Sequence, residues 1–148
     1  MNTELIITIA EDDDGHAALI MRNLKRAGLD NQMIRFRDGQ EALDFFLRRG
    51  NKAQREHNSH YILLLDIRMP KVDGVEVLRQ LKQDHELRKM PVIMLTTTDD
   101  PREVEKCHAL GCGSYIAKPV DYDAFVEIIR QLGFFIKLVE VPQINGVA

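Results

Sequence analysis

Short apolar segments alternate with segments of helical periodicity along this chain, and this alternation constrains the fold more than any other feature. The segments 5–10, 61–65 and 91–96 are strand-length and almost wholly apolar, which is typical of strands buried on both faces. The segment 15–27 between them carries apolar residues at the spacing of one helix face. Because strands that alternate with helices build a parallel sheet covered by helices on both sides, we expect an α/β fold.

Capping residues place most of the remaining elements. Asp38, Asp100 and Asp121 stand where helix N-caps are expected, Pro101 occupies a first helical position, and Gly111 marks a helix end. The pattern is five strand–helix units in a row. The predicted strands are 5–10, 32–37, 61–65, 91–96 and 114–117, and the predicted helices are 15–27, 39–49, 75–83, 101–110 and 122–132.

Length and composition exclude several classes of protein. The 148 residues fit one domain and leave no room for a separate effector. A net charge of -3 argues against a broad nucleic-acid-binding surface, and no apolar segment is long enough to span a bilayer. The chain starts without the basic segment of a secretory signal, and two cysteines suit a reducing compartment. We expect a cytoplasmic protein with no nucleic-acid or membrane partner.

Charged and hydroxyl side chains follow the predicted strands. Glu11 and Asp12 come after the first strand, Asp66 after the third, Thr96 ends the fourth and Lys118 follows the fifth. Because the carboxyl ends of parallel strands share one edge of a sheet, and ligands bind beyond that edge, these side chains should meet in one site.

The chemistry of this set indicates phosphoryl transfer. Clustered carboxylates repel one another unless a cation is present, and oxygen ligands suit a hard ion such as Mg²⁺. Asp66 is a candidate nucleophile, since carboxylates form aspartyl-phosphates. Lys118 supplies a positive charge and Thr96 a hydroxyl donor for phosphoryl oxygens.

The residues around Asp66 carry a family resemblance. Glu11-Asp12, the segment 65–74 (LDIRMPKVDG), Thr96 and Lys118-Pro119 occur in the order found in response-regulator receiver domains of two-component signalling. Residues 5–132 resemble that family. The resemblance implies a flavodoxin-like, doubly wound (βα)5 fold with strand order 2-1-3-4-5, a receiver domain at 1–133 and a carboxy-terminal extension at 134–148.

The same resemblance assigns roles to individual positions. It implies that Asp66 accepts phosphate from a sensor histidine kinase, with Lys118 and Thr96 assisting. It implies a switch pair formed by Thr96 and Tyr115, and a cis peptide between Lys118 and Pro119. The metal, Mg²⁺ or Mn²⁺, would be held by the side chains of Glu11, Asp12 and Asp66 and by the backbone carbonyl of Arg68.

The segments 42–50 and 134–142 narrow the resemblance to the stand-alone regulators of bacterial phytochromes. That subgroup implies a phytochrome-type kinase as partner. It also implies a homodimer formed through the fourth helix, the fifth strand, the fifth helix and the apolar tail. A last helix that runs on over the core explains the tail equally well.

Three other functions remain to be weighed. An aspartyl phosphatase or phosphotransferase would use a second aspartate two residues after Asp66, where this chain has Arg68. A binding module that no longer accepts phosphate would not need the full set of acids, lysine and threonine. A DNA-binding regulator would need more than the 16 residues that follow Leu132. We therefore expect a signalling phosphoacceptor rather than an enzyme.

Overall fold

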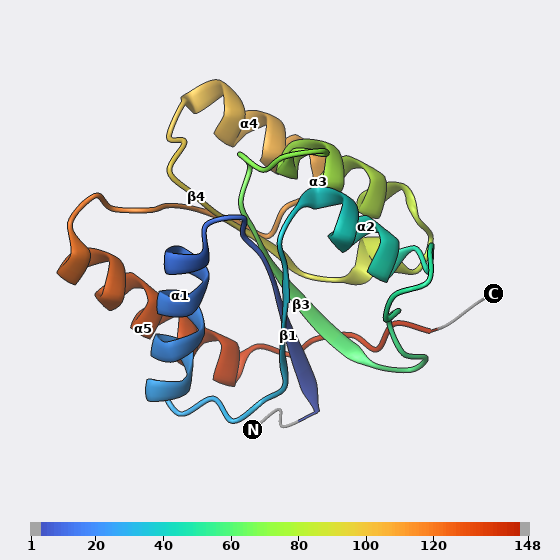
Figure 1. The fold of residues 1–148 in the computed structure, drawn as a ribbon, viewed down its shortest axis with the longest axis horizontal. Helices are drawn as coiled ribbons and strands as arrows, with labels where there is room; N and C mark the ends of the chain where they lie inside the picture. Colours follow the sequence, from blue (N-terminus) through green and yellow to red (C-terminus); the bar gives the residue numbers. More distant parts are fainter. Residues whose placement is uncertain (1–3, 146–148) are drawn as a thin grey trace.

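The computed structural model describes residues 4–145, and within them five parallel strands form one sheet in the order β2-β1-β3-β4-β5 (Figure 1). This is the strand order that the resemblance implied, and the flavodoxin-like α/β fold is confirmed. The strands are β1 (Leu5–Ala10), β2 (Met33–Phe36), β3 (His60–Leu65), β4 (Val92–Thr96) and β5 (Ser114–Ala117).

The helices cover the sheet on both faces. They are α1 (Asp14–Arg26), α2 (Gly39–Phe46), α3 (Gly74–Gln83), the 3₁₀ turn η1 (Leu87–Lys89), α4 (Pro101–Leu110) and α5 (Tyr122–Leu138). Helices α1 and α5 pack together on one face, whereas α2, α3 and α4 lie on the other (Figure 1). Among residues 4–145, no helix has both the length and the apolar character needed to cross a membrane.

Side chains of the central strands point alternately to the two faces of the sheet and so belong to two separate cores. In β1, Leu5, Ile7 and Ile9 pack into the core beneath α1 and α5, whereas Ile6 and Ala10 pack into the core beneath α2 and α3. Because successive residues of a strand point to opposite faces, a strand covered on both sides has to be apolar throughout. This packing accounts for the continuous apolar segments that dominate the sequence.

The predicted N-caps are confirmed, but α2 ends earlier than expected. Asp38, Asp100 and Asp121 each accept a hydrogen bond from a backbone N–H of the first helical turn. Helix α2 ends at Phe46 instead of residue 49, because Arg55 supplies partners for its last turn. The Arg55 backbone N–H donates to Phe45 O at 3.0 Å, and Arg55 Nε donates to Phe46 O at 2.8 Å.

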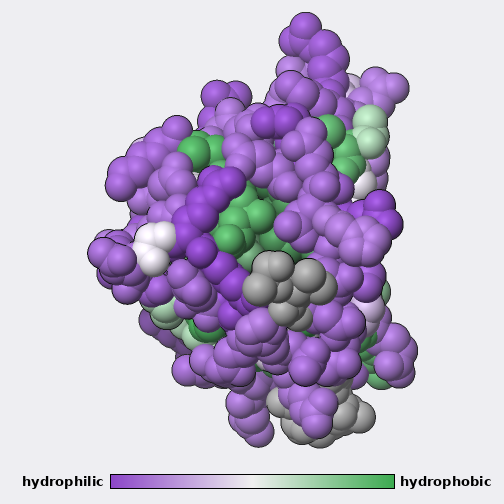
Figure 2. All heavy atoms as spheres, turned by 90° about the vertical axis from the view of Figure 1, so that its right-hand side faces the viewer, coloured by the Kyte–Doolittle hydropathy of each residue, from purple (hydrophilic) through white to green (hydrophobic). Residues whose placement is uncertain are grey.

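Helix α5 is longer than predicted and runs to Leu138, past the proposed boundary between residues 133 and 134. Its buried face continues through Ile136, and Gly133 fits so closely that an added Cβ would lie 2.6 Å from Ala27 Cβ. The chain then returns along the base of the sheet, where Ile144 is buried and pairs with Ser59. The surface in Figure 2 is largely hydrophilic around a small central apolar patch.

Candidate functional site

The carboxyl ends of β1 and β3 bring three acids together. One carboxylate oxygen from each of Glu11, Asp12 and Asp66 lies within 4.8 Å of the other two. The two strands are joined up to this point, since the Asp66 backbone N–H donates to Ala10 O at 3.0 Å. Glu11 and Asp66 are buried, whereas Asp12 is exposed. This arrangement of oxygen ligands, closed on one side and open on the other, suits a hard divalent cation that retains water.

Asp66 has one carboxylate oxygen without a partner. Its Oδ2 lies 3.3 Å from Lys118 Nζ, but its buried Oδ1 accepts no hydrogen bond from any residue that the structure describes. A buried acceptor left unpaired costs free energy, and a bound ion, a bound water or a catalytic role can account for such an atom in a native protein. The Asp66 carboxylate lies in a cluster with two further carboxylates, so a bound cation fits the residues present.

Lys118 is buried among acceptors. Its ammonium group donates to Glu11 Oε1 and to Asp66 Oδ2, and it lies 3.2 Å from His16 Nδ1. Strand β5 places the residue there, since the Lys118 backbone N–H donates to Thr96 O at 2.7 Å. An ammonium group with three donors and three acceptors is held at one position beside the Asp66 carboxylate.

Burial raises the pKa of Glu11 to about 7, with the negative charge of Asp66 adding to the effect. The hydrogen bond and charge of Lys118 act in the opposite direction and only partly compensate. A divalent cation would favour the ionised carboxylate, because opposite charge lowers the pKa of an acid. The site therefore carries an electrostatic cost that cation binding would relieve.

Thr96 and Tyr115 contact the same backbone segment. Thr96 is fully buried, and its Oγ1 accepts from the Thr98 N–H at 3.4 Å. The Tyr115 hydroxyl donates to Thr98 O at 2.5 Å, and burial raises the pKa of Tyr115 to about 12. The two predicted switch residues are therefore joined through Thr98, at the start of the loop that leads to α4.

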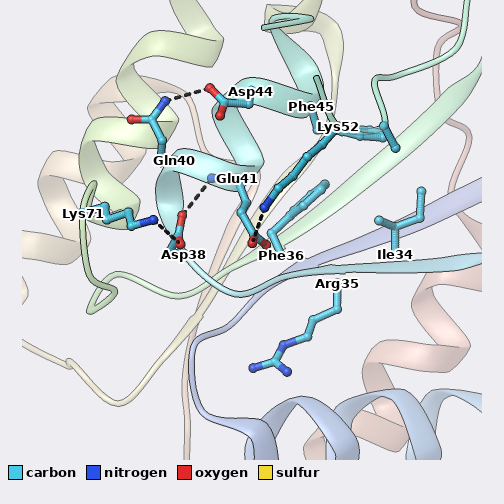
Figure 3. A pocket seen from close by; sticks show the side chains of 11 residues that line it. Ile34, Arg35, Phe36, Asp38, Gln40, Glu41, Asp44, Phe45, Lys52 and Lys71 are labelled. Carbon is cyan, nitrogen blue, oxygen red and sulfur yellow. Dashed lines mark hydrogen bonds and ion pairs between the residues drawn. The ribbon is translucent and has the colours of Figure 1, made fainter. Parts of the chain in front are cut away.

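Arg68 and the loop around it form the open side of the site. Arg68 Nε donates to Thr98 Oγ1 at 3.3 Å, and the side chain lines a hollow shared with Asp12 and Glu103. The metal-binding role of the Arg68 backbone carbonyl stays a prediction. Farther along the same loop, Lys71 Nζ lies 3.6 Å from Asp38 Oδ2, which ties the loop to the start of α2 (Figure 3).

The expected cis peptide between Lys118 and Pro119 is wrong, because no peptide bond within residues 4–145 is cis. The trans form of an X–Pro bond is favoured by about 0.5–1 kcal/mol, so a cis bond needs surrounding contacts that select it. The residue that follows, Val120, is fully exposed and offers no such packing.

Two residues near the site were missed by the sequence analysis. Arg35, on the edge strand β2, donates from Nε and Nη2 to Glu11 O at 3.0 and 2.8 Å, and from Nη1 to Asp14 Oδ1 at 2.6 Å. Figure 3 shows its side chain directed away from the α2 side and toward α1. His16 is the other, through its contact with Lys118. A charged residue inside an apolar strand was the available signal for Arg35; His16 offered none.

The fold and this site define a class of protein. The family model of the response regulator receiver domain matches residues 7–130, and the chain belongs to that family. The match includes Glu11, Asp12, Asp66, Thr96 and Lys118 within its bounds.

Known relatives include regulators linked to phytochromes. A response regulator receiver domain from Rhodospirillum rubrum is 40% identical, with a TM-score of 0.89 over 95% of this chain and 99% of that one. Response regulator Rcp1 of Synechocystis sp. is 28% identical over 95% of each chain. Its Mn²⁺-bound crystal structure gives a TM-score of 0.83 at 29% identity, covering 93% of this chain and 98% of that one. The phosphorylated cyanobacterial phytochrome response regulator RcpA is 26% identical, with a TM-score of 0.81 over 93% of this chain and 97% of that one.

Proposed function

We propose that this protein is a single-domain response regulator that accepts a phosphoryl group on Asp66 from a sensor histidine kinase. The observation that carries the proposal is the buried Asp66 carboxylate, which has an unpaired Oδ1 and lies beside two further carboxylates and Lys118. Its role is signalling, and the chain assists its own phosphorylation and dephosphorylation. A cytoplasmic location is part of the proposal.

Each site residue has a defined part in this transfer. Glu11, Asp12 and Asp66 would hold Mg²⁺ or Mn²⁺, with the Arg68 carbonyl as a further ligand; a Mn²⁺-bound relative supports this assignment. When bound, the ion neutralises charge on the phosphoryl oxygens. Lys118 contacts Asp66 directly and is positioned to pair with another phosphoryl oxygen.

The output would be a change of surface shape. The Thr96 hydroxyl, now bonded to Thr98, would turn to a phosphoryl oxygen, and Tyr115 would move with the shared Thr98 segment. This movement would bias α4, β5 and α5 between two arrangements, as local charge events do in other switches. The bonds of both side chains to one backbone residue support the coupling.

We further propose a phytochrome-type kinase as partner and a homodimer formed through α4, β5 and α5. The phytochrome-linked relatives support the kinase. Exposed Phe134, Phe135 and Leu138 on α5 support the dimer, because apolar side chains grouped on a surface mark interaction sites. In this proposal, residues 134–148 are the extension that adds to the receiver domain at 1–133.

Intact-mass measurement after incubation with acetyl phosphate and Mg²⁺ tests the central proposal. Wild-type protein should gain one phosphoryl group, whereas Asp66→Asn should gain none and fold normally. The proposal fails if the wild type stays unmodified with both acetyl phosphate and a phytochrome-type histidine kinase. For the dimer, Leu138→Ser should lower the sedimentation coefficient; an unchanged value would remove that part.

A further inference from the structure

His16 contacts the site through Lys118, the residue that pairs with the acids Glu11 and Asp66. It occupies the third position of α1, where its backbone N–H donates to the N-cap Asp13 at 2.9 Å. Its ring packs against Phe125 of α5, with 5.8 Å between ring centroids. Both ends of the residue are therefore fixed, and its Nδ1 lies 3.2 Å from Lys118 Nζ.

In the contact between Lys118 and His16, only Lys118 can donate the hydrogen. An ammonium group carries only donors, so the contact is a hydrogen bond when His16 Nδ1 is the acceptor. Glu11 and Asp66 accept the other two hydrogens of Lys118. His16 is thus the one acceptor of the three that belongs neither to the group of acids nor to the proposed phosphoacceptor.

We propose that His16 is a positioning residue that holds Lys118 at the phosphoryl group, an inference that rests on the proposed function of Asp66. In the phosphorylated state Glu11 and Asp66 would hold the metal and the phosphoryl group, and His16 would be the present partner left to keep Lys118 beside a phosphoryl oxygen. Without it, the ammonium group would be free to swing into the adjoining hollow of about 360 Å³, which His16, Lys118 and Phe125 help to line.

Two substitutions separate hydrogen bonding from packing. His16→Leu keeps bulk against Phe125 but removes the acceptor, whereas His16→Asn keeps an acceptor oxygen near the place of Nδ1. His57→Leu is the matched control, because His57 is an exposed histidine of the loop before β3. At saturating Mg²⁺, His16→Leu should be phosphorylated by acetyl phosphate about tenfold more slowly than wild type, since a lost bond to a charged group has an effect of that size.

His16→Asn should recover a rate within about threefold of wild type, and His57→Leu should match wild type. The proposal is overturned if His16→Leu reacts at the wild-type rate, or if His16→Asn is as slow as His16→Leu. The Lys118 ammonium resonance in ¹⁵N NMR gives a readout that needs no phosphorylation. It should shift in His16→Leu and return in His16→Asn; an unshifted resonance rejects the contact even if Asp66 proves not to be the phosphoacceptor.

Discussion

Strand β3 has a buried polar cluster at each end, and the two clusters are built differently. At its carboxyl end, Lys118 donates to both Glu11 and Asp66, and Asp66 Oδ1 has no partner among residues 4–145. At its amino end, buried Arg55 donates to Phe46 O and Asn145 O, and buried Glu86 accepts from the Asn145 N–H and pairs with the more exposed Lys89.

This difference separates function from structure. Charges that bond to backbone groups fix chain segments in place, as Arg55 and Glu86 do for the end of α2 and for the returning tail. Buried charges that contact other charges shift one another's pKa values, as at Glu11, and shifted pKa values are common at reaction sites. The amino end also holds a buried atom without a partner among the described residues, Arg48 Nη2, but no cluster of acids surrounds it.

The largest expected effect comes from adding a side chain at Gly74, which packs against the carboxyl end of β3. A Cβ at Gly74 would lie 2.0 Å from the Asp66 backbone oxygen, so Gly74→Ala should lower the free energy of unfolding by about 3 kcal/mol. Urea denaturation followed by circular dichroism measures this. Gly113→Ala is the control, since its Cβ would meet Val92 O at an ordinary 3.6 Å. Equal stability of the two variants would contradict the close packing under Asp66.

The next effect tests the amino end. Ile144 is fully buried and belongs to the core beneath α2 and α3, so Ile144→Ala should reduce stability by about 2–3 kcal/mol. Acetyl phosphate should still modify Asp66 in the folded variant at close to the wild-type rate. A variant that is folded but no longer phosphorylated would show that the two ends of β3 are coupled.

The two clusters should respond to pH with opposite sign. Folding raises the pKa of Glu11 from 4.5 to about 7, so folded protein holds a proton that unfolded protein has lost, and this contribution lowers stability as pH rises across that window. The pKa of Glu86 is lowered by Lys89 and by the Asn145 N–H, so its contribution is present above pH 4.5 and is lost as pH falls.

Urea titrations in EDTA at several pH values measure both contributions. Glu11→Gln should remove the loss of stability between about pH 5 and 7 and weaken Mg²⁺ binding. Glu86→Gln should lose stability at neutral pH and bind Mg²⁺ as wild type does. An unchanged pH profile in Glu11→Gln would show that this carboxyl group is not the source of the pH dependence.

The smallest expected effect is on Mg²⁺ affinity, when a residue that holds a proposed metal ligand in place is removed. Arg35 holds the Glu11 carbonyl with two hydrogen bonds, so Arg35→Ala should weaken Mg²⁺ binding by about tenfold, the usual size for a residue that orients a ligand. Calorimetric titration gives the dissociation constant. Arg37→Ala is the control, because Arg37 is exposed and its side chain has a 3.4 Å contact with Asp14 but no bond to Glu11 O in the described structure. The same affinity in both variants would rule out this role.

The sequence by itself determined the (βα)5 order, most helix starts and the residues that end each strand. These follow from local chemistry: apolar segments demand burial, aspartates cap helices, and parallel strands end at one edge. Tertiary structure alone decided where α2 and α5 end, because Arg55 and the α1–α5 contact supply the partners. It also decided the trans Lys118–Pro119 peptide and the roles open to Arg35 and His16. These features depend on contacts that form only when the chain is folded, such as that between His16 and Lys118, and residue spacing in the sequence does not predict them.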